Sequence, residues 1–290
     1  MNSTPDPRFR SEQSSADHAA TQQALSETMA PLIDAHIHLD SYDASRQQVI
    51  LSGLAQAEVA GVITVSMHLD SARRNLRLAG QYPSLVHPAF GFHPEQPIPA
   101  SNEVDELLAW MERHAGEMVA VGEVGLPYYT RKEAKETGRP FDDRPYVELL
   151  ERFLAFARDH GKPVVLHAVY EDADTACDLL ERYRIRRAHF HWFKGSPDTV
   201  ERMAKRGYYV SFTPDIVYEE EIQELARAYP ADRVMSETDG PWPFEGPFAG
   251  QMTHPRMTAA VAEAWSRIQG LSLREARELL YMNAKRFYGI

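Results

Sequence analysis

The chain has 290 residues and a formal net charge of -11, from 42 acidic and 31 basic side chains. This balance excludes the broad basic face that grips long duplex nucleic acid, but it leaves open a small phosphate substrate held by metal ions. The hydrophobic fraction of 43% is typical of a globular protein with a sizeable core, and no apolar stretch is long enough to span a membrane.

Residues 1–30 form a polar segment that is rich in Ser, Gln, Thr, Asp and Ala and lacks apolar periodicity. This composition predicts a disordered tail that precedes a single domain over residues 31–290. No continuous apolar region follows Arg8 and Arg10, so we do not expect a secretory signal. Met29 stands directly before the first predicted strand and is a candidate translation start, which the mass of the native protein would decide.

Strand-like apolar runs alternate with helix-period segments from Pro31 onward. The predicted strands are 32–39, 62–69, 85–94, 118–126, 163–169, 188–193, 208–214 and 234–241. The predicted helices are 47–60, 71–82, 103–115, 146–160, 172–184, 196–206, 219–229 and 255–269, followed by a last amphipathic segment at 272–288. Glycines after four of the helical runs indicate where those helices end, namely Gly61, Gly161, Gly207 and Gly270.

Eight such alternating units predict an α/β fold, a (β/α)8 TIM barrel with an extra C-terminal helix. The alternative is a doubly wound open sheet, which would normally carry a Gly-rich phosphate-binding turn after its first strand, and this chain has none there. The one cysteine, Cys177, lies in a helical pattern, so we expect a buried thiol and not a nucleophile. The lack of a disulfide fits a cytoplasmic protein.

Residues with metal-binding chemistry gather where the predicted strands end. In the first strand, IDAHIHLD, regular alternation places Asp34, His36 and His38 on one face. The active site of a parallel barrel lies at the C-terminal ends of its strands. Further candidates at or near that rim are Glu123, His167, His191, Asp239, His68 and His93.

Each candidate also has an ordinary structural explanation. Local hydrogen bonds can satisfy a buried imidazole, and Asp239 can cap the turn before Gly240 and Pro241. Glu123 is harder to explain this way, because a buried, unpaired carboxylate is costly within the apolar run VAVGEVGL. The convergence of histidines from three strands and carboxylates from two at one rim favours a metal site.

Six segments carry a resemblance to a known family: IDAHIHLD, FGFHPE, VGEVGLPYY, PVVLHA, HFHWFKGS and SETDGPW. In order and spacing they resemble the TatD-like hydrolases of the amidohydrolase superfamily, over essentially residues 31–288. The resemblance implies a (β/α)8 barrel that hydrolyses phosphodiesters, as a metal-dependent phosphodiesterase or deoxyribonuclease.

The same resemblance implies two divalent ions with a shared carboxylate. The implied ligands are His36, His38 and Asp239 for one ion, His167 and His191 for the other, and Glu123 as the bridge. His93 matches the family's GxHP position, which faces the active site without being a core ligand. Mixed histidine and carboxylate ligation favours Zn, Mn or Co over Mg, and Asp239 would orient and deprotonate the attacking water.

Two departures from the family pattern bear on the substrate. Pro127 replaces the usual Asp after the fourth strand, and the segment FEGPFAGQMTHP contains no Lys or Arg before Arg256. Segments 127–145 and 240–253 are predicted to be long loops that form a lid. Candidate substrate contacts at this rim are His93, Lys194, Arg131 and Trp242.

These candidates leave alternatives open. Lys194 contacts a phosphate or is a solvated surface lysine, and the aromatic loop with Trp242 stacks on a base or packs as a plug. We expect a small phosphoester or a short nucleic acid as substrate. The missing basic loop makes hydrolysis of a non-phosphate ester, lactone or amide the alternative. A non-catalytic barrel that binds a metal or a partner structurally is disfavoured by the complete ligand set.

Overall fold

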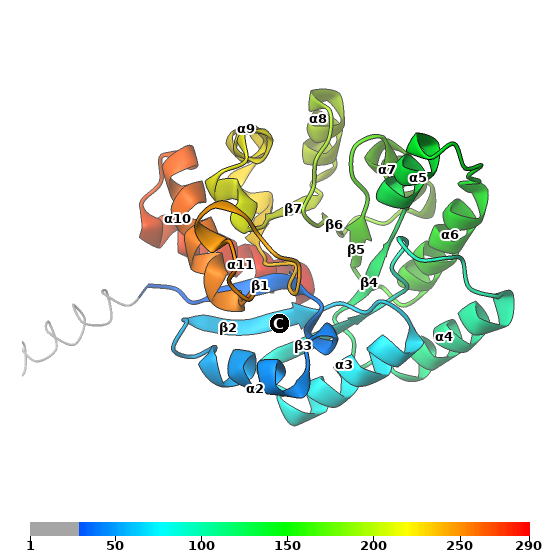
Figure 1. Cartoon of the computed structure of the whole chain (residues 1–290), viewed down its shortest axis with the longest axis horizontal. Coiled ribbons are helices and arrows are strands. Elements are labelled where there is room, and N and C mark those ends of the chain that lie inside the picture. The colour runs from blue at the N-terminus through cyan, green and yellow to red at the C-terminus, as the bar shows by residue number, and fades with distance from the viewer. Residues whose placement is uncertain (1–28) are drawn as a thin grey trace, which may run out of the picture. The chain divides into compact units, whose positions relative to one another are not determined.

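The computed structural model describes residues 29–290, so the predicted tail 1–30 lies outside the described residues except for Met29 and Ala30. Residues 31–290 form one unit, in which eight parallel strands pair in chain order (Figure 1). The strands are β1 (Leu32–Ile37), β2 (Val59–Thr64), β3 (Val86–Phe90), β4 (Ala120–Gly125), β5 (Val164–His167), β6 (Ala188–Phe190), β7 (Tyr209–Phe212) and β8 (Val234–Ser236).

The residues that follow β8 bring the last strand back beside the first. The Asp239 amide donates to the His36 carbonyl at 2.9 Å, and the His38 amide donates to the Gly240 carbonyl at 2.8 Å. The sheet is therefore a nearly closed barrel, which confirms the predicted (β/α)8 fold. A doubly wound open sheet would instead leave its first and last strands at separate edges.

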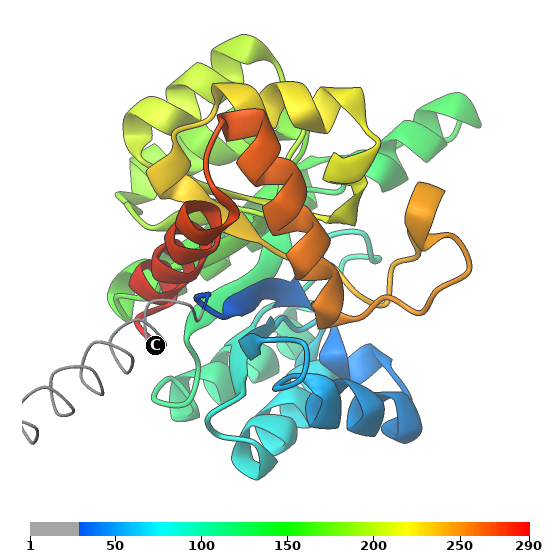
Figure 2. The same cartoon turned by 90° about the vertical axis from the view of Figure 1, so that its left-hand side faces the viewer.

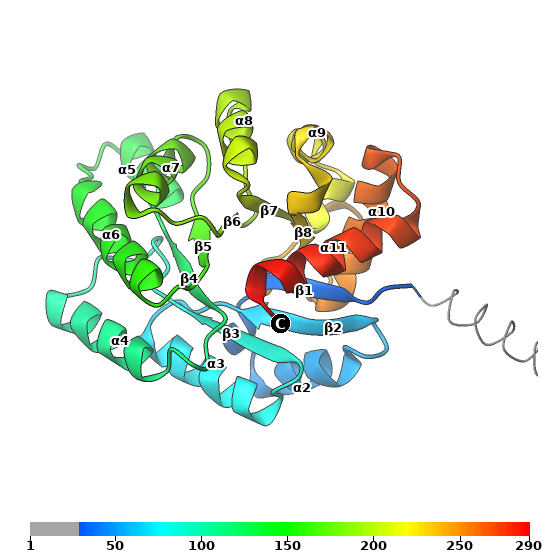
Figure 3. The same ribbon diagram turned by 180° about the vertical axis from the view of Figure 1, so that it is seen from behind.

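Helices connect the strands and cover the outer face of the barrel (Figures 1 and 3). They are α2 (Ala44–Gly53), α3 (Leu69–Gln81), α4 (Ser101–Arg113), α5 (Tyr128–Glu136), α6 (Arg144–Asp159), α7 (Glu171–Tyr183), α8 (Pro197–Arg206), α9 (Glu220–Ala228), α10 (Thr258–Gln269) and α11 (Leu273–Tyr288). Short 3-10 turns are η1 (Leu39–Ser41), η2 (Pro214–Val217), η3 (Ala231–Arg233), η4 (Gly246–Phe248) and η5 (Pro255–Met257). Among residues 29–290, no helix combines the length and the apolar character needed to cross a membrane.

The predicted helix 47–60 is too long. It ends at Gly53, and β2 begins at Val59 after a turn in which Glu58 has a φ of 54°. Gly61 consequently lies inside a strand, and its prediction as a helix end is wrong. The other three predicted helix ends are confirmed, because they have left-handed φ values of 62° at Gly161, 71° at Gly207 and 67° at Gly270.

The predicted loop 127–145 contains a helix, α5, which the sequence pattern did not reveal. Only Ala134 is buried along this helix, so it has no apolar stripe of helical period. Polar contacts hold its first turn, where the amides of Tyr129 and Thr130 donate to Glu95. The lid predicted over this part of the rim is thus a helix followed by a shorter loop.

The barrel interior is apolar at the N-terminal ends of the strands and closed there by the last helix. Interior residues such as Ile33, Ile63 and Val165 pack in one cluster with Phe287 and Tyr288 of α11. Figures 2 and 3 show α11, in red, lying beside β1 at this end. Because all strands are parallel, their C-terminal ends meet at the opposite end, where the polar candidates lie.

Candidate metal centre

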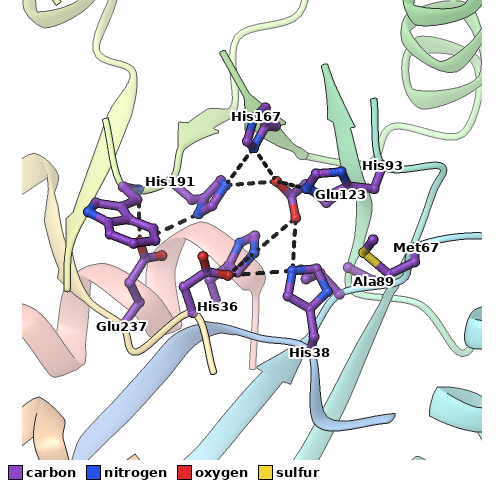
Figure 4. A network of polar contacts seen from close by, with 12 residues as sticks. His36, His38, Met67, Ala89, His93, Glu123, His167, His191 and Glu237 are labelled. Carbon is purple, nitrogen blue, oxygen red and sulfur yellow. Dashed lines mark hydrogen bonds and ion pairs between the residues drawn. The ribbon is translucent and has the colours of Figure 1, made fainter. Parts of the chain in front are cut away.

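Glu123 lies at the centre of the polar cluster, with histidine rings turned toward its carboxylate from several strands (Figure 4). Its Oε2 atom faces the histidines of β1, at 3.1 Å from His36 Nε2 and 3.2 Å from His38 Nε2. Asp239 Oδ1 completes this group, at 3.3 Å from His36 Nε2 and 3.4 Å from His38 Nε2. Two imidazoles and two carboxylate oxygens therefore face one point.

The other oxygen of Glu123 faces a second group. Oε1 lies 3.0 Å from His167 Nδ1 and 2.7 Å from His191 Nε2. The two ring nitrogens lie 3.4 Å from each other. The carboxylate of Glu123 thus stands between two imidazole pairs and presents a different oxygen to each.

The donor set fits divalent cations. The buried atoms His36 Nδ1, His36 Nε2, His38 Nδ1, Glu123 Oε2 and Asp239 Oδ1 have no hydrogen-bond partner within the described part of the chain. Buried polar atoms are normally satisfied. Three of these orphaned atoms, His36 Nε2, Glu123 Oε2 and Asp239 Oδ1, face one another, which indicates a missing partner. Four sets of three side chains have ligand atoms close enough to hold an ion: His36, His191 and Glu237; His36, His38 and Asp239; His38, His93 and Glu123; and Glu123, His167 and His191.

The histidines and carboxylates of the cluster shift one another's pKa values. Burial would raise the pKa of Glu123, but the surrounding histidines, His191 first, hold it well below its usual range. Burial would lower the pKa of His38, but the carboxylates of Asp239 and Glu123, which face its Nε2 atom, raise it to about 10. Glu123 is thus ionised and His38 attracts a proton, which a bound cation would replace.

Local irregularities in two strands turn the predicted ligands inward. Ile33 and Ala35 pack into the barrel interior, whereas Ile37 packs in the cluster with α2, and the β1–β2 register shifts between Asp34 and Ile37. His36 and His38 face the centre beyond this shift. The prediction that Asp34 shares their face by regular alternation is therefore wrong, since Asp34 lies between two interior residues.

The fourth strand, β4, has the same kind of irregularity in its register. Ala120 faces the interior and Val124 packs in the outer cluster, with a register shift against β5 between Val121 and Val124. Glu123 is thereby turned inward. Gly125 allows β4 to pass close to β5, because a Cβ at this position would lie 1.9 Å from the His167 carbonyl oxygen.

Two carboxylates beside the cluster, Glu95 and Glu237, were not among the predicted site residues, and a third, Asp34, has another place than predicted. Glu95 Oε1 lies 3.3 Å from His167 Nε2, and Glu237 Oε1 lies 3.6 Å from His191 Nδ1. Asp34 accepts from the amide of Thr238 at 3.0 Å, and burial raises its pKa to about 7. Glu95 and Glu237 lie in the segments FGFHPE and SETDGPW, each two residues from a predicted site residue. An acidic residue this close to a predicted site residue was the signal by which the sequence could have indicated them.

The two remaining rim histidines have different places. His93 Nε2 lies 3.3 Å from Glu123 Oε1, and its Nδ1 accepts from the amide of Glu95 at 3.1 Å. His93 therefore belongs to the cluster. His68 does not, because it caps α3, where its Nδ1 accepts from the Ser71 amide at 3.3 Å.

Arg131, a predicted substrate contact, is engaged by acidic neighbours. Its guanidinium lies 2.7 Å from Asp172, 3.1 Å from Asp143 and 3.3 Å from Glu171. These three carboxylates offset its charge. A phosphate contact by Arg131 stays a prediction, and it would require these ion pairs to exchange.

Lys194 and Trp242, the other predicted contacts, lie on separate loops. Lys194 is half-buried, and its carbonyl accepts from the Tyr170 amide at 2.6 Å. Trp242 is 58% exposed, with its ring 6.0 Å from that of Trp192. Phe244 of the same loop is buried against Trp192, so one part of the loop packs while Trp242 stays accessible.

Known proteins share this fold over nearly its whole length. A family model described as TatD related DNase matches residues 33–289. A Haemophilus influenzae protein described as an uncharacterized metal-dependent hydrolase is 36% identical over 258 residues, which are 89% of this chain and 99% of that protein. Human deoxyribonuclease TATDN3 is 26% identical, over 89% of this chain and 94% of that protein. The crystal structure of the Escherichia coli TatD homolog YJJV has a TM-score of 0.77 and 26% identity, covering 91% of this chain and 100% of that one.

Proposed function

The chain belongs to the TatD related DNase family and is a metal-dependent hydrolase, and from this premise we propose that it is a two-metal phosphodiesterase. Its expected substrates are small phosphoesters or short nucleic acids, in line with the name of the human relative, a deoxyribonuclease. The observation that carries the proposal is the carboxylate of Glu123. Its Oε2 faces His36 and its Oε1 faces His191, so one side chain can bridge two ions.

The residues take separate roles in this proposal. The implied ligands are His36, His38 and Asp239 on one side, His167 and His191 on the other, and Glu123 between them. Bound divalent ions, Zn, Mn or Co before Mg, would supply an acidified water and neutralise charge on the phosphoryl group. Asp239 is the more accessible of the two carboxylates, with 11% of its side chain exposed against 0% for Glu123. It would take the proton of the attacking water and return it to the leaving oxygen.

One observation favours a second candidate, the hydrolysis of a non-phosphate ester, lactone or amide. Arg131, a predicted phosphate contact at the rim, is already engaged by three carboxylates. A neutral carbonyl substrate would need no such cation. The same ligands would polarise a carbonyl oxygen as they would a phosphoryl oxygen.

Hydrolysis assays with added Zn²⁺, Mn²⁺ or Mg²⁺ separate the two candidates. We expect metal-dependent turnover of bis-p-nitrophenyl phosphate and of a short DNA strand. Glu123→Gln should lower kcat/KM at least about 100-fold, because it removes the charge of the bridging ligand, whereas loss of an outer partner costs about 10- to 100-fold. Glu106→Gln, which changes a surface carboxylate paired with Arg73, is the matched control and should be unaffected.

The outcomes of this assay distinguish the two candidate functions from each other and from a non-catalytic barrel. Turnover of carboxylic esters, lactones or amides without any phosphodiester turnover would replace the first candidate with the second. No turnover of either class, together with no bound metal by elemental analysis, would support a non-catalytic barrel.

A further inference from the structure

His167 is held through both of its ring nitrogens. Nδ1 faces the Oε1 atom of Glu123 at 3.0 Å, and Nε2 faces the Oε1 atom of Glu95 at 3.3 Å. A neutral imidazole carries one proton, so the nitrogen that faces a cation must be bare and the other must be the donor. Both nitrogens face carboxylate oxygens, so a cation at Nδ1 would place the proton on Nε2, which would donate to Glu95, and would leave the lone pair of Nδ1 directed at Glu123 and His191.

Glu95 is itself fixed by the first turn of α5. Its Oε1 accepts from the amide of Tyr129 at 2.8 Å, and its Oε2 accepts from the amide and the hydroxyl of Thr130 at 2.7 Å and 2.5 Å. Each oxygen of Glu95 therefore accepts a hydrogen bond from a backbone amide of α5, which fixes the carboxylate in place.

The loop that carries Glu95 is fixed as well. The Glu95 amide donates to His93 Nδ1 at 3.1 Å, and the side chain of Gln96 donates to the Met67 carbonyl at 2.8 Å. The His93 amide donates to the same carbonyl at 3.0 Å. These contacts hold the carboxylate at one position relative to the strand ends, as an orienting group requires.

We propose that Glu95 is a positioning residue that orients His167 for metal binding and at the same time fastens α5 beside the site. The inference rests on the metal centre of the proposed function and does not depend on the substrate. It assigns a role to a loop residue between β3 and α4 and gives α5 a link to the ligands. Because binding linkage is reciprocal, an ion on His167 should also stabilise the first turn of α5.

Zn²⁺ affinity, measured by competition with a chromophoric chelator, tests the orienting role. Glu95→Ala should weaken the affinity about 10- to 100-fold for one of the two ions, as loss of an outer carboxylate partner typically does. Glu95→Gln keeps an acceptor of the same shape without its charge, so it should restore most of the affinity while staying several-fold weaker than wild type. Glu103→Ala removes a carboxylate that caps α4 and should bind Zn²⁺ like wild type.

Amide hydrogen exchange tests the link to α5. In the wild type, Zn²⁺ should slow exchange at Tyr129 and Thr130, and in Glu95→Ala the exchange should be fast with or without Zn²⁺. A merely structural role for Glu95 predicts something else: faster exchange in α5 and unchanged Zn²⁺ affinity. That result would overturn the inference.

The variants also separate this inference from the proposed function. If wild-type protein binds no Zn²⁺, the metal centre is wrong and the inference falls with it. If wild type binds two ions and both Glu95→Gln and Glu95→Ala bind them equally well, only the inference is overturned. Should Glu95→Ala fail to fold, the Gln variant decides by the same affinity measurement, and unchanged binding counts against the proposal.

Discussion

The charge state of Glu123 depends more on the imidazoles around it than on its burial. Its side chain is fully buried, and burial alone would favour the protonated acid. The rings of His191, His93 and His36 reverse this effect and lower its pKa. An ionised carboxylate with two oxygens facing opposite sides of the cluster is what a bridging ligand needs.

Cys177 shows burial acting without such compensation. The thiol lies in α7 with no exposed surface, and burial raises its pKa to about 12. At pH 8, roughly one such thiol in ten thousand is ionised, and the thiolate is the reactive form. We expect the folded protein to resist DTNB at pH 8, and the guanidinium-unfolded protein to release one equivalent of thionitrobenzoate, measured by absorbance.

Cys177→Ala provides the blank for this measurement, since the sequence contains no other cysteine. The variant should release no thionitrobenzoate in guanidinium. Rapid release of a full equivalent by the native wild type would contradict a buried, protonated thiol.

At the scale of elements, the sequence predicts which strands end in site residues. Ligand-type residues close apolar runs of the sequence, and parallel strands bring their C-terminal ends together. The direction of each side chain was less predictable. Register shifts in β1 and β4 turn His36 and Glu123 inward, and such irregularities depend on how neighbouring strands pair, which one strand's sequence does not contain.

Loops gave the least information. Glu95 lies between β3 and α4, and α5 has one buried residue, so neither follows a strand or a helix period. Their contact is between residues 34 and 35 positions apart in the sequence. A hydrogen bond between such distant residues follows from the folded arrangement of the loop and the helix, and the sequence pattern does not predict it.

The last helix closes the barrel through a buried chain of hydrogen bonds. Tyr288 donates its hydroxyl to the Ala35 carbonyl at 2.9 Å, and the same hydroxyl lies 2.9 Å from His189 Nδ1. The other nitrogen of His189 lies 2.5 Å from Ser211 Oγ, which donates to Glu237 at 2.6 Å. His189 therefore faces the closed end of the barrel, two residues before His191 at the open end.

Tyr288→Phe should lower the free energy of unfolding by about 1–3 kcal/mol, because it leaves the buried Ala35 carbonyl and His189 without this partner. Urea titration followed by circular dichroism measures the change. Tyr281→Phe is a matched control on the same helix, where the ring is half-buried and contacts Lys285. Its effect should stay within about 0.5 kcal/mol, and equal losses in both variants would contradict a special role for the Tyr288 hydroxyl.

Charge is the property of the whole molecule that bears most on the substrate. The net charge is -11, and three arginines of the segment 127–145 pair with acids: Arg131 with Asp172, Arg139 with Glu133, and Arg144 with Asp142. These three arginines are therefore already paired with acids and are not free to neutralise a nucleic-acid backbone. A metal-bound phosphodiester would need little further neutralisation, whereas a long strand would need a basic track.

Salt dependence measures how many phosphates the protein neutralises. Each phosphate contact to a single strand contributes about 0.7 to the slope of log affinity against log salt. If a short DNA strand is a substrate, we expect log KM to rise with log KCl with a slope below about 2, which corresponds to at most two or three contacts. If Lys194 is one of them, Lys194→Ala should lower the slope by about 0.7 without changing kcat. Lys205→Ala, which removes a surface lysine paired with Glu201 on α8, should leave the slope unchanged.

A slope of about 4 or more would mean an extended phosphate track, and would contradict the view that metal ligands and one nearby cation suffice to hold the substrate.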